Sequence, residues 1–445
     1  MTITKTLRVW RLAVFAVISL GLTACSSPTP KPKTAADVQQ SGGGAAALVK
    51  AKPQRKLSGE AKSDFMAVVK KYESAKKSGL KGGACADLAS EFGDVYAAHN
   101  LPEAKFNQGV LLEQCGNRKE AAQVYSSLLA KHPKFAPAIN NLGELKVLSG
   151  EGGAALDLFQ EAVRLKSSEG YTNLAMLQRG RALAGERAVL VDAVNNIHRS
   201  LAVDSSNIDA YNLKAVLVYD HAQGSSKLEM ARLLAVQAAK QQPSYAPIYN
   251  VLGLVLLKQG KVTPALQQFR KAVERDPNFI DALMNIGAIT LSFRDYKTAE
   301  NSFERVLKLG APSKEIEHAA TVGLGVALRG QRKYQEALAK YQAAEKLKPS
   351  DTSLAYNIGV LYQDYLFDAG TPEKGISTLK TALGHLQRYL AGNTRLVRKK
   401  DAERRAKNIR EMIPMLVEQQ KMMEDMRKMQ EKQKAQDAAA NKKKS

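Results

Sequence analysis

The sequence predicts an all-α protein in which pairs of short helices stack along the chain. Two observations support this fold class. Five stretches of about 34 residues share a small residue at position eight, an alanine twelve residues later and an aromatic residue four after that. Alanine, leucine, lysine and glutamine are common while aromatic residues make up only 6%, a composition that suits helices packed through small side chains.

The five stretches begin at residues 102, 136, 246, 280 and 318. Their small residue, alanine and aromatic residue are, in turn, Gly109, Gly143, Gly253, Gly287 and Gly325; Ala121, Ala155, Ala265, Ala299 and Ala337; and Tyr125, Phe159, Phe269, Phe303 and Tyr341. Two helices cross closely only where a small residue lets the backbones approach. We expect the aromatic residue to fill the gap between one pair and the next, and a closing proline, such as Pro277, to end the second helix.

This pattern resembles the tetratricopeptide repeat, whose period is about 34 residues. The steps from Gly109 to Gly143, from Gly253 to Gly287 and from Gly325 to Gly359 are all 34. The resemblance implies a right-handed superhelical solenoid over residues 101–392. Three further units, with small residues Ala175, Ala215 and Gly359, carry extra residues that we place in the turn between their two helices.

Both ends of the solenoid are predicted to be helical. Residues 58–100 form a capping helix pair, because their apolar residues recur at helical spacing. Residues 393–436 form a charged helix, bent or broken at Pro414, whose apolar stripe covers the last repeat. Residues 437–445 form a basic tail.

Cys85 and Cys115 are expected to form a disulfide bond. Cys85 begins the second capping helix and Cys115 ends the first helix of the next unit. Neighbouring helices of opposite direction bring these two ends together, and closing a loop of about thirty residues contributes roughly 3 kcal/mol. The alternative is a pair of buried free thiols.

Residues 1–24 are typical of a bacterial export signal. Lys5, Arg8 and Arg11 precede an apolar run from Leu12 to Leu22, too short for a spanning helix. The following Leu-Thr-Ala-Cys resembles the lipobox of bacterial lipoproteins, which implies cleavage before Cys25, acylation of Cys25 and attachment to a membrane through lipid. The alternative is an ordinary signal peptide followed by a chance cysteine.

The segment after Cys25 indicates where the anchored protein resides. The residue after Cys25 is Ser26 and not aspartate, which by resemblance to enterobacterial lipoproteins favours the outer membrane, facing the periplasm. Residues 25–57, rich in Pro, Gly, Ser and Lys, form a flexible linker.

The formal charge of +23 is concentrated at the two ends of the chain. Residues 31–81 hold twelve basic and four acidic residues, and residues 395–445 hold sixteen and eight, while residues 82–394 keep a net charge of only +4. Basic flanks bind anions by charge. In an exported protein these anions are lipid phosphates, lipopolysaccharide or cell-wall polymers, and no nucleic-acid partner is expected. Solvated ends that keep the protein soluble are the alternative.

The sequence carries no sign of catalysis. Six scattered histidines lack metal-ligand spacing, and the patterns of a phosphate-binding loop or a nucleophile elbow are missing. We therefore expect a protein that is not an enzyme and that has neither cofactor nor metal.

The resemblance instead implies a groove that binds protein partners, lined by the first helix of each repeat. Asparagines among apolar residues suit a peptide or helix, although they could equally support packing between repeats. Carried over position by position, the groove residues are Phe106, Asn107, Val110, Asn140, Asn141, Glu144, Asn250, Leu254, Leu257, Met284, Asn285, Tyr356, Asn357 and Val360.

The function implied is a lipid-anchored scaffold that assembles an envelope complex. Lipoproteins of this type serve pilus secretin assembly, outer-membrane protein insertion, regulation of cell-wall synthases and the gliding-motility machinery of myxobacteria. Length, repeat number and the basic C-terminal helix resemble the gliding-motility lipoproteins most. A regulator that docks on a peptidoglycan synthase or hydrolase, and a secretin or outer-membrane assembly factor, are the alternatives.

Overall fold

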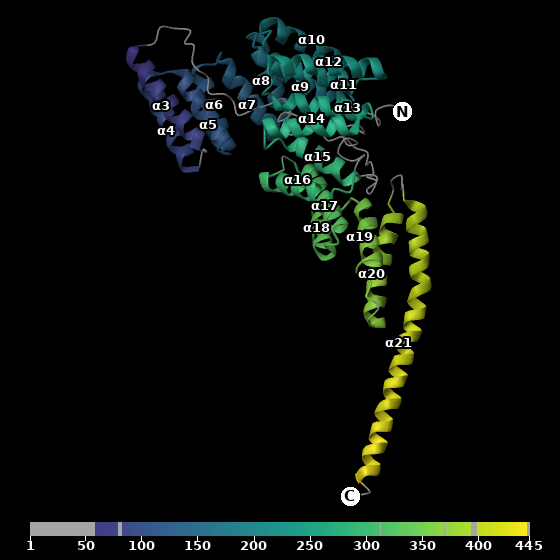
Figure 1. The fold of residues 1–445 in the computed structure, drawn as a ribbon. Coiled ribbons are helices and arrows are strands. Elements are labelled where there is room, and N and C mark those ends of the chain that lie inside the picture. Colours follow the sequence, from purple (N-terminus) through teal and green to yellow (C-terminus); the bar gives the residue numbers. More distant parts are fainter. Residues whose placement is uncertain (1–57, 79–81, 312, 369, 393–397, 443–445) are drawn as a thin grey trace. The chain divides into compact units, whose positions relative to one another are not determined.

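The computed structural model describes residues 58–78, 82–311, 313–368, 370–392 and 398–442. These residues form nineteen helices, α3 to α21, and no strand (Figure 1). The predicted export signal, Cys25 and the linker 25–57 lie outside the described residues. Within them, no helix has both the length and the apolar character needed to cross a bilayer.

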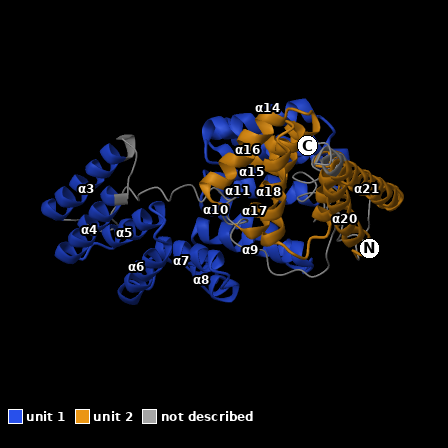
Figure 2. Ribbon diagram, turned by 90° about the horizontal axis from the view of Figure 1, so that it is seen from below, with its two compact units in different colours: residues 1–8, 30–282 blue, residues 9–29, 283–445 orange. Residues whose placement is uncertain are grey.

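The helices fall into two compact units whose boundary lies within α15 (Ile280–Ser292), between Ala282 and Leu283 (Figure 2). The helices of unit 1 are α3 (Gly59–Ser78), α4 (Gly82–His99), α5 (Pro102–Gln114), α6 (Arg118–Lys131), α7 (Ala136–Leu148), α8 (Gly152–Arg164), α9 (Ser168–Ala184), α10 (Val189–Val203), α11 (Ile208–Asp220), α12 (Ser225–Gln241), α13 (Ala246–Lys258) and α14 (Val262–Arg275). Those of unit 2 are α16 (Tyr296–Leu309), α17 (Lys314–Gly330), α18 (Tyr334–Leu347), α19 (Ser353–Asp364), α20 (Pro372–Leu390) and α21 (Lys399–Lys442).

The repeated glycine and aromatic residue contact each other inside each helix pair. A Cβ atom at Gly253 of α13 would lie 2.5 Å from Cε1 of Phe269 in α14. Because this is far below a normal carbon–carbon contact, only glycine lets the fully buried ring lie against the α13 backbone. In unit 2, Phe303 has the role expected from the sequence, since its ring lies against both Gly287 of α15 and Gly323 of the next pair.

The turn inside each pair is also repeated. The first helices α5, α7, α9, α13, α15 and α17 are each followed by a backbone N–H that donates to the carbonyl oxygen five residues earlier, as from Asn117 to Leu112 and from Lys261 to Leu256. This hydrogen bond marks a Schellman motif, which needs one residue with positive φ. Glycine supplies it at Gly116 and Gly260, whereas Arg294 adopts a φ of 61° despite its side chain.

The irregular units differ in where their extra residues lie: residues 365–371 separate α19 from α20, as expected for a longer turn, whereas the unit of α9 and α10 has longer helices. α9 extends for 17 residues, compared with 13 in α7. Only four residues then separate α9 from α10. Our expectation that the extra residues lie in the turn is therefore wrong for this unit, because residues up to Ala184 keep helical hydrogen bonds and Gly185, with a φ of 124°, ends the helix.

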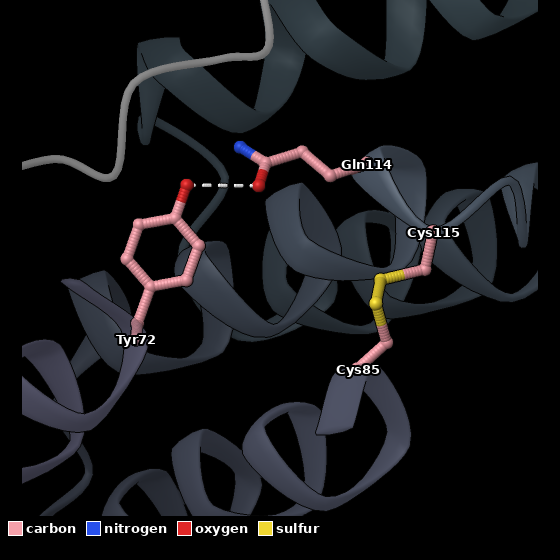
Figure 3. Close-up of a disulfide and its surroundings, with 4 residues drawn as sticks. All are labelled: Tyr72, Cys85, Gln114 and Cys115. Carbon is pink, nitrogen blue, oxygen red and sulfur yellow. Dashed lines mark hydrogen bonds between the residues drawn. A yellow bond between two sulfur atoms is a disulfide. The ribbon is translucent and has the colours of Figure 1, made fainter. Parts of the chain in front are cut away.

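The capping pair contains the expected disulfide (Figure 3). Cys85 lies in the first turn of α4 and Cys115 directly follows α5, with their Cα atoms 6.1 Å apart. Beside it, the Tyr72 hydroxyl of α3 donates to Oε1 of Gln114, at 2.9 Å. Phe65 and Phe92 pack in the core between α3 and α4. Three successive helices are thus joined by a covalent bond, a hydrogen bond and an apolar core.

The C-terminal helix is longer and more continuous than the sequence suggests. α21 passes through Pro414 without interruption and ends at Lys442, so the break at Pro414 and the separate tail from residue 437 are wrong. Proline removes one backbone donor and leaves the carbonyl group of Arg410 without its usual partner. Pro414 is exposed, so water can bind that carbonyl group and the helix continues.

Candidate functional site

Most residues expected in the groove are buried between helices. First helices contact one another as well as their own second helices: α9 contacts α7 and α11, and α13 contacts α11. The groove prediction is wrong for the side chains that are buried among the packed helices, namely Phe106, Asn107, Val110, Asn140, Asn250, Leu254, Met284, Asn285, Tyr356, Asn357 and Val360. Asn141, Glu144 and Leu257 are half-buried and keep surface for a partner.

A row of polar side chains links the first helices of unit 1. The Asn141 amide of α7 donates to Oε1 of Glu113 in α5, at 3.4 Å. The Asn173 amide of α9 donates to Oε1 of Glu144 in α7, at 2.9 Å. We call Glu113, Asn141, Glu144 and Asn173 the amide–carboxylate ladder. Its asparagines connect successive repeats, which agrees with the alternative that the asparagines support packing between repeats. Asn140 does the same, donating to Oγ of Ser167 at 2.9 Å.

Burial raises the pKa of three carboxyl groups in this region. Burial raises the pKa of Glu144 to about 8, and the charge of Glu113 adds to the effect. Burial also raises the pKa of Glu113, although hydrogen bonds from Tyr125 and Asn141 oppose the shift. On α11, burial raises the pKa of Asp209 to about 7, against a hydrogen bond from the Tyr245 hydroxyl. Within the described residues, none of these three carboxyl groups forms an ion pair.

Several members of this region were missed in the sequence. Glu113 occupies position twelve of its repeat and Asp209 position two of its own. The resemblance to tetratricopeptide repeats places positions two, five, six, nine and twelve of each unit in the groove, so this rule could have identified both residues. Arg179 of α9 and Asp220 of α11 form a buried ion pair, with 2.6 Å between Nε and Oδ2. Nothing in the local sequence pattern indicates that pair, because 41 residues separate its members.

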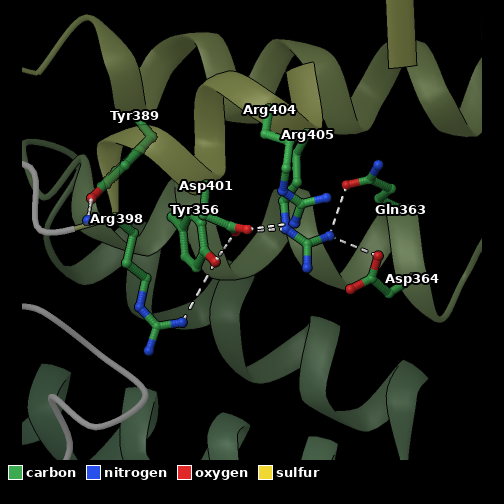
Figure 4. A network of polar contacts seen from close by, with 8 residues as sticks. All are labelled: Tyr356, Gln363, Asp364, Tyr389, Arg398, Asp401, Arg404 and Arg405. Carbon is green, nitrogen blue, oxygen red and sulfur yellow. Dashed lines mark hydrogen bonds and ion pairs between the residues drawn. The ribbon is translucent and has the colours of Figure 1, made fainter. Parts of the chain in front are cut away.

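Unit 2 has a contrasting polar network, in which Asp401 of α21 is the shared acceptor (Figure 4). The Tyr356 hydroxyl of α19 donates to Oδ2 of Asp401 at 2.6 Å, and Nε of Arg405 donates to the same oxygen at 2.8 Å. Arg405 also reaches Oδ1 of Asp364 in α19, at 2.8 Å. Tyr356 is buried, and its hydroxyl group connects α19 to α21 through this hydrogen bond.

An apolar contact accompanies this network. Ala402, Ala406 and Ile409 of α21 are buried against α19 and α20, and Met412, Ile413 and Leu416 extend the contact. The expectation that the C-terminal helix covers the last repeat is confirmed. Burial alone would raise the pKa of Asp401, but hydrogen bonds from Tyr356, Arg404 and Arg405 overcome it and hold the pKa at about 2.

Across the part of the chain that the structure describes, no three or more His, Cys, Asp and Glu side chains are grouped so that they could hold a metal ion.

Comparison with known proteins identifies the repeats. A family model described as tetratricopeptide repeat matches residues 220–278 and 291–352. The chain contains tetratricopeptide repeats. Two solved structures of IFIT1 share the fold at 14% identity. Human IFIT1 has a TM-score of 0.51, covering 91% of this chain and 94% of its own. A monomeric IFIT1 mutant has a TM-score of 0.54, covering 90% and 95%.

Curated relatives match over a smaller part of the chain. The human protein O-mannosyl-transferase TMTC1 is 26% identical over 215 residues, which is 48% of this chain and 24% of TMTC1. The bovine BBSome complex member BBS4 is 20% identical over 272 residues, which is 59% of this chain and 49% of BBS4. The chain therefore spans about a quarter of the first relative and half of the second.

Proposed function

We propose that this protein is a lipid-anchored scaffold whose tetratricopeptide repeats bind protein partners and assemble an envelope complex. Acylation of Cys25 would hold it on the outer membrane, facing the periplasm. The complex we favour is a gliding-motility machine, from the resemblance of length, repeat number and C-terminal helix. The basic flanks, residues 31–81 and 395–445, would contact anionic lipids or cell-wall polymers.

The observation that carries partner binding is the set of carboxyl groups on first helices of unit 1. Glu113 and Glu144 accept hydrogen bonds from neutral amide and hydroxyl groups, and the negative charge of Glu113 raises the tendency of Glu144 to hold a proton. A lysine or arginine of a partner would supply the missing cation. Leu257 on α13 offers partly exposed apolar surface in the same unit. These features suit a peptide segment that combines basic and apolar residues.

Such binding has a measurable consequence. With a pKa of about 8, Glu144 is mostly protonated at pH 7. A bound cation would lower this pKa, so binding should release protons. Titration calorimetry of a Lys/Leu-containing peptide, in two buffers of different ionisation enthalpy, should therefore give different apparent enthalpies.

Substitutions distinguish specific binding at Glu144 from a general attraction between the peptide and negative charge on the protein. Glu144→Gln keeps the Asn173 hydrogen bond but removes the charge, and should weaken peptide binding about tenfold and abolish the proton release. Glu120→Gln, on the exposed surface of α6, is the matched control and should bind as the native chain does. Equal loss in both variants would contradict a specific site.

The anchor and the complex need separate tests. Cys25→Ser should move the protein from the membrane fraction to the soluble fraction, and retention in the membrane would refute the lipid anchor. Affinity capture from solubilised membranes should recover motility-machine subunits with the native chain and fewer of them with Glu144→Gln. Recovery of a peptidoglycan synthase or hydrolase, or of secretin components, would support the corresponding alternative function.

A further inference from the structure

The second half of α21 exposes an unusual amount of apolar surface. The contact with α19 and α20 ends at Leu416. Beyond it the helix continues past the end of α20 (Figure 1). Met422, Met426 and Met429 are exposed by 60%, 60% and 71%. Exposed methionines that recur along one helix form a surface suited to another apolar face.

These methionines follow the spacing of a coiled coil. Residues at alternating steps of three and four are Gln419, Met422, Met426, Met429, Gln433 and Gln436. This is the a/d pattern of a helix that pairs with another helix. We call these six residues the Met–Gln seam. Three methionines lie at its centre, and glutamines, which tolerate water, lie towards its ends.

We propose that residues 419–436 of α21 pair with the same segment of a second copy of this chain as an antiparallel coiled coil. A two-fold axis between Arg427 and Lys428 sets Met426 against Met429 of the second copy. It also sets Met422 against Gln433 of the second copy. The paired segment begins after Leu416, so the second helix packs on surface that α19 and α20 do not cover.

Charges within the paired segment are complementary in this direction. In the antiparallel pair, Asp425 lies next to Lys432 of the second copy, and the symmetry repeats the contact. Both side chains are exposed, and Asp425 sits 4.0 Å from Lys428 within its own helix. A parallel pair would place Asp425 beside the uncharged Gln430 of the second copy and would pair Lys432 with Asp437, which lies beyond the Met–Gln seam. Within residues 419–436 the complementary charges fit a second copy in the opposite direction, and a charge change at Asp425 tells the two directions apart.

A charge exchange tests the proposal with the full-length chain in detergent micelles. Self-association would be measured by sedimentation equilibrium over a range of protein concentrations, corrected for bound detergent. Asp425→Lys turns both attractions into repulsions and should raise the dissociation constant of the dimer about tenfold. Adding Lys432→Asp to the same chain should restore the native dissociation constant, because the two charges are merely exchanged.

A matched control removes the effect of net charge. Glu424→Lys changes the charge by the same amount, but residue 424 lies on the outer side of the helix, opposite the seam. It should leave the dissociation constant unchanged, and circular dichroism should show equal helix content in all variants. A native chain that stays monomeric, or equal weakening by Asp425→Lys and Glu424→Lys, would overturn the proposal. So would methionine-dependent binding of α21 to anionic vesicles in place of self-association.

Discussion

Glu144 of unit 1 and Asp401 of unit 2 both connect neighbouring helices, yet their surroundings shift the pKa in opposite directions. Burial, together with the charges of neighbouring carboxyl groups, raises the pKa of Glu144 to about 8, although the hydrogen bond from the Asn173 amide opposes the shift. Tyrosine and arginine donors hold the pKa of Asp401 at about 2. The same type of side chain thus serves as a neutral link in one unit and as a charged link in the other.

The difference extends to the other connections in the two units. Unit 1 has a disulfide and an ion pair, Arg179–Asp220, whose side chains are only 2% exposed. Unit 2 fastens α21 with ion pairs that water partly reaches, such as Arg405–Asp364. Removing one partner of a buried ion pair greatly lowers the free energy of unfolding, because the other charge is left buried and unpaired. The attraction in an exposed ion pair is weakened by salt. The two units should therefore respond differently to substitution, reductant, pH and salt.

The largest difference is expected between the two kinds of ion pair. Asp220→Ala leaves Arg179 buried without its carboxylate and should lower the free energy of unfolding by about 3–5 kcal/mol. Asp364→Ala removes a partly exposed partner of Arg405 and should cost about 1 kcal/mol or less. Urea denaturation of both variants measures the contrast. Equal costs would show that burial does not distinguish the two pairs.

Loss of the disulfide should have the next largest effect on the free energy of unfolding. Replacing Cys85 and Cys115 together by serine opens a loop of about thirty residues and should cost about 3–4 kcal/mol in the chain-entropy model. Hydrogen exchange should become faster in α3, α4 and α5 and stay unchanged in α19 to α21. Reductant should reproduce the effect in the native chain. If α21 loses protection equally, the disulfide does not act locally.

The pH dependence of unit 1 should be smaller. The pKa of Glu144 is raised in the folded state, so the unfolded state loses its proton first, and stability falls as pH rises from about 4.5 to 8. Because Glu144 is half-buried, we expect a loss of about 1–2 kcal/mol, read as faster hydrogen exchange in α7 and α9. Glu144→Gln should remove this dependence. A variant with the native pH profile would assign it to another group.

The smallest effect concerns α21. The folded-state pKa of Asp401 lies below the ordinary value of about 3.9, so its contribution is present above pH 4 and is lost as pH falls towards 2. Screening at this partly exposed site limits the contribution to about 1 kcal/mol. Hydrogen exchange in residues 399–416 should accelerate below pH 4, and Asp401→Asn should show the faster exchange already at pH 7. Added salt should accelerate exchange there more than in α7.

The sequence alone determined the helix pairs, because a repeat protein contacts mainly its nearest neighbours. Gly253 and Phe269 meet at a fixed offset of sixteen residues, and Cys85 and Cys115 lie on adjacent helices. Both contacts follow from the number of residues that separate the two partners along the chain.

Tertiary structure decided how much of each first helix stays accessible. Asn250 and Leu254 lie at positions expected to face a ligand, but neighbouring helices cover them. The Arg179–Asp220 pair and the Asp401 network depend on how closely separate helices approach. The distance between two helices is set by the combined size of the many side chains between them, and it cannot be read from any single position of the repeat.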